Sequence, residues 1–96
     1  MKATLRPEAE ADLENAALWY EERRQGLGWR FLDEVLNTIA LIVENPNRYP
    51  LIHGDIRRAV TPRFPFGVFY LTEGDAIVVI AVMHASRDPA RWKERA

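Results

Sequence analysis

The chain has 96 residues, no cysteine and a formal net charge of −1, with 48% hydrophobic and 28% charged residues. This length predicts one domain, residues 1–96. The lack of cysteine excludes disulfides, thiolate metal sites and a cysteine nucleophile, and it suits a reducing cytoplasm. No signal peptide is apparent, and no apolar stretch reaches the roughly 20 residues of a membrane helix, so we expect a cytoplasmic protein without membrane contact.

The two halves of the chain differ in charge. Residues 1–45 carry five Lys/Arg and nine Asp/Glu, a net charge of −4, whereas residues 46–96 carry eight and five, a net charge of +3. Such polarity can steer an anionic partner toward one face. This charge asymmetry is weaker than the excess of Lys and Arg in a protein that binds many phosphates. Two solvent-exposed faces of different charge explain the asymmetry equally well.

The first half predicts a strand followed by two helices. Residues 2–6 form a short segment that contains Thr4 and Leu5 and is interpreted as an opening strand. It ends at Pro7, which is typical of the first turn of a helix. One helical stripe follows, made of Leu13, Ala16, Ala17 and Tyr20. Gly26 predicts the end of this helix. A second helix is expected from about Gly28 to Asn45, with an apolar stripe of Leu32, Val35, Leu36, Ile39, Ile42 and Val43.

The second half predicts three strands after a proline-containing loop at 46–54. The strands are expected at 56–61, 66–71 and 76–84, and Glu73-Gly74-Asp75 predicts a hairpin turn. The last strand has no charge from Ala76 to Met83 and does not alternate, so we expect it to lie centrally with both faces covered. Asp88-Pro89 predicts a short helical tail at 89–95.

These elements define an α+β fold with the order β-α-α-β-β-β. Only two or three residues separate the helices, which therefore form an antiparallel hairpin. We expect this hairpin to pack on a curved antiparallel sheet.

The element order and several short motifs resemble the RelE/ParE superfamily, the toxins of type II toxin–antitoxin modules, also called plasmid stabilisation proteins. The motifs are P-E-A-E-A-D-L at 7–13, E-N-P at 44–46, F-P-F-x-V-x-Y at 64–70 and H-x-x-R-x-P-x-x-W at 84–92. The resemblance covers nearly the whole chain. It implies a helix pair on one face of the sheet and a cognate antitoxin whose C-terminal segment wraps the toxin.

The motifs F-P-F-x-V-x-Y and H-x-x-R-x-P resemble ParE-type members more closely than RelE-type members, and two departures from the RelE-type pattern argue against nuclease activity. RelE-type toxins cut messenger RNA in the ribosome without a metal, and resemblance to them implies an arginine three residues before the tyrosine of the middle strand. That tyrosine is Tyr70 here, and the earlier position is Gly67. RelE-type toxins also carry a tyrosine near the C-terminus, where this chain has Trp92. ParE-type members poison DNA gyrase.

His84, Arg87 and Arg58 are the candidate catalytic residues. An imidazole that titrates near neutrality can act as acid or base beside a phosphate, and arginines can stabilise the charge that develops there. The alternative is a histidine that ends a buried strand and bonds to the backbone or to Asp88. Because Arg57 and Arg58 are adjacent on a strand, they should point to opposite faces.

A second set of residues is expected to bind the antitoxin or the target. Its members are cations and tryptophans near strand ends and helix ends: Arg57, Arg58, Arg63, Arg87, Trp29 and Trp92. One of the adjacent arginines should line a groove for an acidic amphipathic segment. The other should pair with Glu34 or Glu44 or reach solvent. Arg63 is also expected to be solvated.

Several of these residues have a purely structural alternative. An ion pair of Arg87 with Asp55 or Asp75 explains this residue as readily as a contact with a ligand does. Trp19, Trp29 and Trp92 are equally typical of core or hinge packing, although tryptophan is also enriched at interface hot spots.

The sequence contains no phosphate loop, no H-E-x-x-H, no G-x-S-x-G and no metal-binding histidine spacing, so no cofactor or metal is expected. Three functions remain open at this point. The chain is a ParE-like toxin that binds gyrase, a ribosome-dependent endoribonuclease acting on mRNA, or an inactive member that only binds its antitoxin.

Overall fold

The computed structural model describes residues 2–96. In chain order the elements are β1 (Lys2–Leu5), α1 (Pro7–Arg23), α2 (Leu27–Glu44), β2 (Leu51–His53), β3 (Ile56–Val60), β4 (Phe66–Glu73), β5 (Ala76–His84) and α3 (Ala90–Lys93). Within residues 2–96, neither long helix is apolar enough over its length to cross a membrane.

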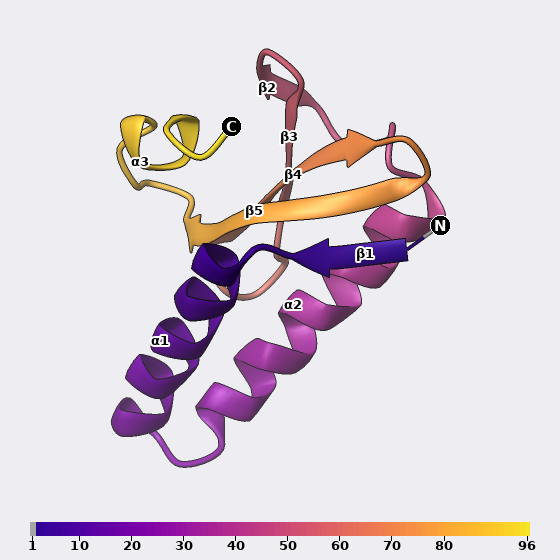
Figure 1. The fold of residues 1–96 in the computed structure, drawn as a ribbon. Helices are drawn as coiled ribbons and strands as arrows, with labels where there is room; N and C mark the ends of the chain where they lie inside the picture. Colours follow the sequence, from indigo (N-terminus) through magenta and orange to yellow (C-terminus); the bar gives the residue numbers. More distant parts are fainter. Residues whose placement is uncertain (1) are drawn as a thin grey trace.

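The five strands form one strongly twisted sheet in the order β1-β5-β4-β3-β2 (Figure 1). The predicted α+β fold is confirmed, and β5 lies inside the sheet as expected. Two details differ from the prediction. β1 runs parallel to β5, so the sheet is mixed, whereas all other neighbours are antiparallel. Residues 51–53 of the predicted loop form the short edge strand β2.

The two faces of the sheet have separate apolar clusters. α1 and α2 cover one face (Figure 1), where Phe31, Val35 and Ile42 of α2 pack against Val68 and Tyr70 of β4. The other face carries a smaller cluster made of Ile56, Phe69, Ile80, Ala81, Met83 and Trp92. The helix α3 lies on this second face and places Trp92 on the ring of Phe69, with 4.9 Å between the ring centroids. We refer to this second face as the uncovered face, because the helical hairpin does not reach it.

A β-bulge in β5 reverses the direction of its last side chains. Phe69 pairs with Ala81, but Tyr70 pairs with Val79, so Ile80 has no partner on β4. Ile80 and Ala81 consequently both belong to the uncovered face, although they are adjacent. After the bulge the alternation continues in the opposite phase, which turns His84 toward the helix-covered face.

The tip of the hairpin is closed by Glu21. Its carboxylate accepts hydrogen bonds from the backbone N–H groups of Gly26 (2.8 Å) and Gly28 (2.9 Å), which lie at the start of α2. A helix N-terminus leaves such N–H groups without internal partners and favours a negative charge nearby. Gly26 adopts a positive φ of 87°, which allows the tight reversal between the helices.

Where β1 ends, side chains provide the hydrogen-bond partners that a neighbouring strand would give to the edge of β5. Beyond Val79, no strand within residues 2–96 pairs with the outer edge of β5, and there the N–H of Val82 donates to the Asp12 carboxylate (3.0 Å). Arg95 from the C-terminal tail donates to the same carboxylate and to the carbonyl of Ile80. The tail is thereby fixed against α1 and β5.

Candidate functional site

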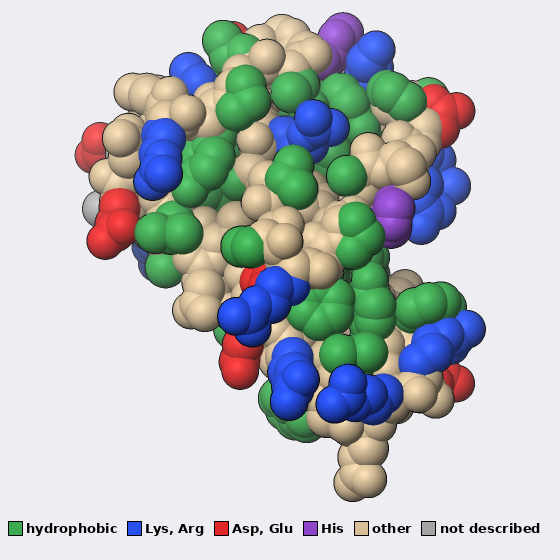
Figure 2. Space-filling view, turned by 180° about the vertical axis from the view of Figure 1, so that it is seen from behind, with side chains coloured by type: hydrophobic (Ala, Val, Ile, Leu, Met, Phe, Trp, Pro, Cys, Tyr) green, Lys and Arg blue, Asp and Glu red, His purple; other side chains and the backbone are tan. Residues whose placement is uncertain are grey.

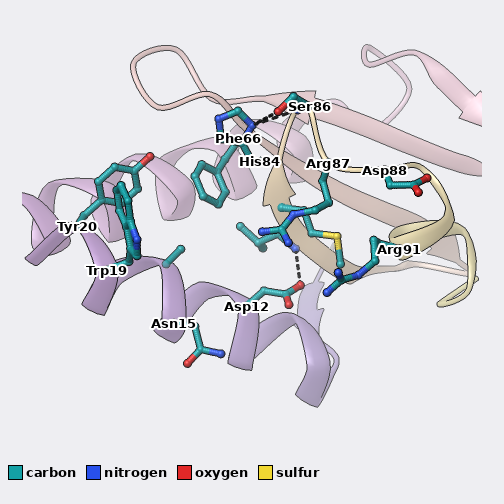
Figure 3. A pocket seen from close by; sticks show the side chains of 13 residues that line it. Asp12, Asn15, Trp19, Tyr20, Phe66, His84, Ser86, Arg87, Asp88 and Arg91 are labelled. Carbon is teal, nitrogen blue, oxygen red and sulfur yellow. Dashed lines mark hydrogen bonds between the residues drawn. The ribbon is translucent and has the colours of Figure 1, made fainter. Parts of the chain in front are cut away.

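One hollow of the surface is a cleft of about 850 Å³ between α1, the end of β5 and the loop that leads to α3. We call it the α1–β5 cleft. Trp19 and Tyr20 of α1 line one side, and His84, Ser86, Arg87, Asp88 and Arg91 line the other, with Phe66 between them (Figure 3). Val82 of β5 also lines the cleft. In Figure 2 the surface is hollowed where the hairpin projects from the body, with apolar side chains inside and basic side chains on both sides.

The His84 ring is held in a defined orientation at the rim of this cleft. It packs edge-to-face against Phe66, with 5.7 Å between the ring centroids. Its Nδ1 accepts a hydrogen bond from the Ser86 N–H (3.2 Å) and lies 2.7 Å from the Ser86 hydroxyl oxygen. The tautomer in which Nδ1 accepts the Ser86 N–H bond carries its proton on Nε2.

Arg87 and Arg91 extend from the loop and from α3 toward α1 (Figure 3). Within residues 2–96, neither guanidinium makes an ion pair, and the predicted pairs of Arg87 with Asp55 or Asp75 are not formed. The two acids of the cleft are already engaged. Asp12 binds Arg95 and the Val82 N–H, and Asp88 accepts from the N–H of Ala90 at the start of α3.

Arg58 lies on the uncovered face and not in the cleft. It faces Phe69 in the β3–β4 register, and its stem crosses Gly67. A Cβ at Gly67 would lie 3.0 Å from Cδ and 3.1 Å from Cγ of Arg58, so the stem fills the space that a side chain at position 67 would take. In the described part of the chain, Nε of Arg58 is buried without a hydrogen-bond partner, which is uncommon for a buried donor.

Arg57 and Arg58 do point to opposite faces, as predicted. Of the two alternatives for the arginine on the helix-covered face, a pair with Glu34 or Glu44 is not formed within residues 2–96; Arg57 is partly exposed and donates to the backbone carbonyls of Asn47 and Tyr49. Arg57 also lies beside the Tyr70 phenol, which donates to the carbonyl of Pro46. Burial raises the pKa of Tyr70 to about 12, although the Arg57 charge acts to lower it.

Glu34 has a different structural role from the predicted one. Its carboxylate accepts from the backbone N–H groups of Arg63 (2.9 Å) and Phe64 (3.0 Å), which fixes the loop between β3 and β4 on α2. The Arg63 side chain is exposed, as expected.

The three tryptophans differ in exposure. Trp92 is buried at 6%, so it packs in the core as one of the two interpretations predicted, whereas Trp19 is 50% and Trp29 is 70% exposed. Trp19 and Trp29 therefore do not lie in the core, and packing at the hairpin hinge stays a prediction for them. The ring of Trp19 is covered on one side by the Arg23 guanidinium, 3.6 Å from the ring centroid.

The structure brings some of the candidate residues together and separates others. His84 and Arg87 share the α1–β5 cleft, whereas Arg58 lies on the opposite face of the sheet. Sequence reasoning missed Trp19, Arg91 and Ser86 as partners of His84 in this cleft. The only available signal was the position of Trp19 next to the core stripe of α1. Within residues 2–96, no three Asp, Glu or His side chains converge as a metal ion would require.

Comparison with known proteins agrees with this architecture. A family model described as ParE toxin of type II toxin–antitoxin system, parDE, matches residues 3–89. A solved structure titled "Chromosomal ParDE TA system from P. aeruginosa" contains a chain that is similar in fold, with a TM-score of 0.76 and 17% sequence identity. The match covers 88% of this chain and 95% of that one. No curated protein sequence matches the chain.

Proposed function

Because this chain belongs to the ParE toxin family of type II toxin–antitoxin systems, we propose that it arrests growth by binding a protein target, DNA gyrase. A cognate antitoxin, bound as a hetero-oligomer, neutralises it. The site of action is the cytoplasm, where gyrase works.

One observation favours binding over catalysis as the toxic activity. Cleavage of RNA by its own 2′-hydroxyl needs an acid, a base and cations around a single phosphate. His84 and Arg58 lie on opposite faces of the sheet, so they cannot contact one phosphate. At the position of the RelE arginine this chain has Gly67, and the stem of Arg58 covers it.

The test is expression of the chain alone, followed by a supercoiling assay with purified gyrase. We expect growth arrest and loss of supercoiling, both reversed by the protein encoded in the neighbouring reading frame. Arrest with unchanged supercoiling at saturating toxin would refute gyrase as the target. Harmless expression would support an inactive member that only binds its antitoxin.

A ribosome-dependent endoribonuclease is the second candidate, because the α1–β5 cleft does combine His84 with Arg87 and Arg91. Primer extension on translated messages would then show new cuts when the toxin is expressed. His84→Ala would abolish these cuts, whereas Arg58→Gln on the other face would leave them unchanged. Cutting by the His84 variant at the parent rate would exclude this histidine as acid or base.

A further inference from the structure

We propose that the outer face of the helical hairpin docks on the target, and that it receives a basic surface patch of gyrase with an apolar centre. The outer face is the side of α1 and α2 that is turned away from the sheet, and it carries Glu10, Glu14, Leu18, Trp29 and Leu36. The inference rests on the proposed function, because it assigns the proposed target to a particular surface of the chain.

The first argument is the exposure of large apolar side chains on this face. Leu18 is 63% and Trp29 is 70% exposed, and more than half of Leu36 is exposed. Trp29 and Leu36 are two turns apart on α2 and share one side of it, whereas Phe31 and Val35 of the same helix face the core. Apolar side chains that gather on an exposed surface are typical of an interaction site, and tryptophan is enriched among the residues that dominate binding energy.

The second argument is that the hairpin holds these side chains in place before a partner arrives. The hairpin projects beyond the sheet (Figure 1). Its helices approach closely at Gly28, where an added Cβ would lie 2.5 Å from the carbonyl oxygen of Ala17. Leu18 and Trp29 directly follow these two residues, so they flank the crossing on its exposed side. Because Glu21 also closes the tip, little backbone entropy is lost when a partner docks.

The third argument is the charge of the outer face. From Pro7 to Glu22, α1 contains six Asp/Glu and no Lys or Arg. Glu10 and Glu14 lie on the same stripe of α1 as Leu18, both are exposed, and within residues 2–96 neither makes an ion pair. An enzyme that holds DNA must present Lys and Arg to the phosphates. Gyrase therefore offers the charge that complements this face.

Other occupants suit the outer face less well. In a two-fold contact between copies of the chain, the same face of both copies would meet. Glu10 and Glu14 of one copy would then lie near those of the other, and such like-charge contacts are unfavourable. The same carboxylates would repel the phosphates of a nucleic acid. The outer face is also distinct from the α1–β5 cleft, which α1 lines with other residues, among them Asn15 and Trp19.

The first test removes the apolar centre and measures inhibition of supercoiling by purified toxin over a series of concentrations. The hairpin variant combines Leu18→Ala with Trp29→Ala. The control combines Leu51→Ala with Val60→Ala, two apolar residues of the strands that are also about half exposed. We expect the concentration for half-inhibition to rise at least about tenfold for the hairpin variant and to stay within about threefold of the parent for the control. Equal values for the two variants would overturn the proposal.

The second test reverses charge without touching the apolar centre. Glu10→Lys with Glu14→Lys changes the outer face, and Asp55→Lys with Asp75→Lys makes the same change in net charge at exposed turns between strands. We expect inhibition by the parent and by the turn variant to weaken as salt rises, because opposite charges attract less when screened. The hairpin variant should inhibit at least about tenfold more weakly at low salt. Equal weakening by both variants would show that net charge acts and not this face, and would refute the docking surface.

The outcomes separate this inference from the proposed function. Both hairpin variants should unfold in urea near the parent midpoint and bind the antitoxin as the parent does. If the parent leaves supercoiling unchanged, the proposed function fails and this inference fails with it. If the parent inhibits and both hairpin variants inhibit equally well, only the docking surface is refuted. Loss of antitoxin binding with unchanged inhibition would assign the face to the antitoxin. A dimer in sedimentation that Leu18→Ala with Trp29→Ala dissociates, again with unchanged inhibition, would assign it to a second copy, and both results would refute the proposal.

Discussion

Substitution of Gly28 by alanine should destabilise the fold, although alanine is the better helix former. Gly28 lies in the first turn of α2, where the hairpin helices approach closely. A Cβ at this position would lie 2.5 Å from the carbonyl oxygen of Ala17 and 3.1 Å from Cβ of Glu21. The Ala17 oxygen is a backbone atom, so the clash with the added Cβ is relieved only if α1 and α2 move apart. This movement would weaken the hydrogen bonds of Glu21 that close the tip of the hairpin.

The expected magnitude follows from two opposing effects. Alanine in place of glycine stabilises a helix by up to about 1 kcal/mol. Overpacking that moves backbone costs about 1–3 kcal/mol, and weakening of the Glu21 bonds costs about 1 kcal/mol more. The net loss should be about 2 kcal/mol out of a total stability of roughly 5–14 kcal/mol for this length. With a urea dependence of about 1 kcal/mol per molar, the unfolding midpoint should fall by about 2 M.

Ala40→Gly is the matched control, since Ala40 is exposed in the same helix. It should cost about 1 kcal/mol through helix propensity alone. Gly28→Ala and Ala40→Gly would then both destabilise the protein, although they are opposite exchanges, and helix propensity alone cannot explain this result. A Gly28→Ala variant whose urea midpoint equals or exceeds that of the parent would refute the close-packing argument.

Three further predictions concern contacts that join distant segments. Glu34→Ala should lower the free energy of unfolding by about 1–2 kcal/mol, because two backbone N–H groups of the β3–β4 loop lose their acceptor; Asp33→Ala, an exposed neighbour, should change it by less than about 0.5 kcal/mol in the same urea titration. The folded pKa of Tyr70 is about 12, against 10.0 for the free side chain. The neutral phenol should therefore stabilise the protein fully below pH 10, and this stabilisation should be lost as the pH rises toward 12. Tyr70→Phe should reduce this alkaline loss of stability, and an unchanged stability profile at alkaline pH would contradict the prediction. Arg95→Gln should accelerate amide exchange at the outer edge of β5, because it removes the ion pair with Asp12 that covers this edge; exchange as slow as in the parent would show that the tail does not protect it.

The parts of the fold that depend on local patterns could be predicted from the sequence. The apolar stripe from Leu13 to Tyr20 and the uncharged run from Ala76 to Met83 identify a surface helix and an inner strand, because each element must bury a face of the appropriate period. The parallel pairing of β1 could not be predicted, since a four-residue strand carries no signal for its partner. The strand β2 was missed because it pairs along only a few residues.

The candidate site was harder to predict, because it depends on contacts between residues far apart in the chain. Asp12 and Arg95 are separated by 83 positions, and neither stands in a recognisable motif. Alternation alone would place His84 on the uncovered face, since no glycine or proline marks the bulge at Ile80. Exposure of Trp19 did have a signal in the sequence, since Asn15, Glu22 and Arg23, which lie three or four residues away on the helix, are polar.

The extra residue in β5 has a consequence for how related chains should be aligned. If a relative lacks one residue between its equivalents of Val79 and Val82, the residues beyond that point exchange sides, even when their identities and order are the same. A methionine in the position of Met83 would then look toward α1, and the following histidine would join the opposite surface. Two related chains with the same letters at the end of this strand can therefore present different side chains to the cleft beside α1.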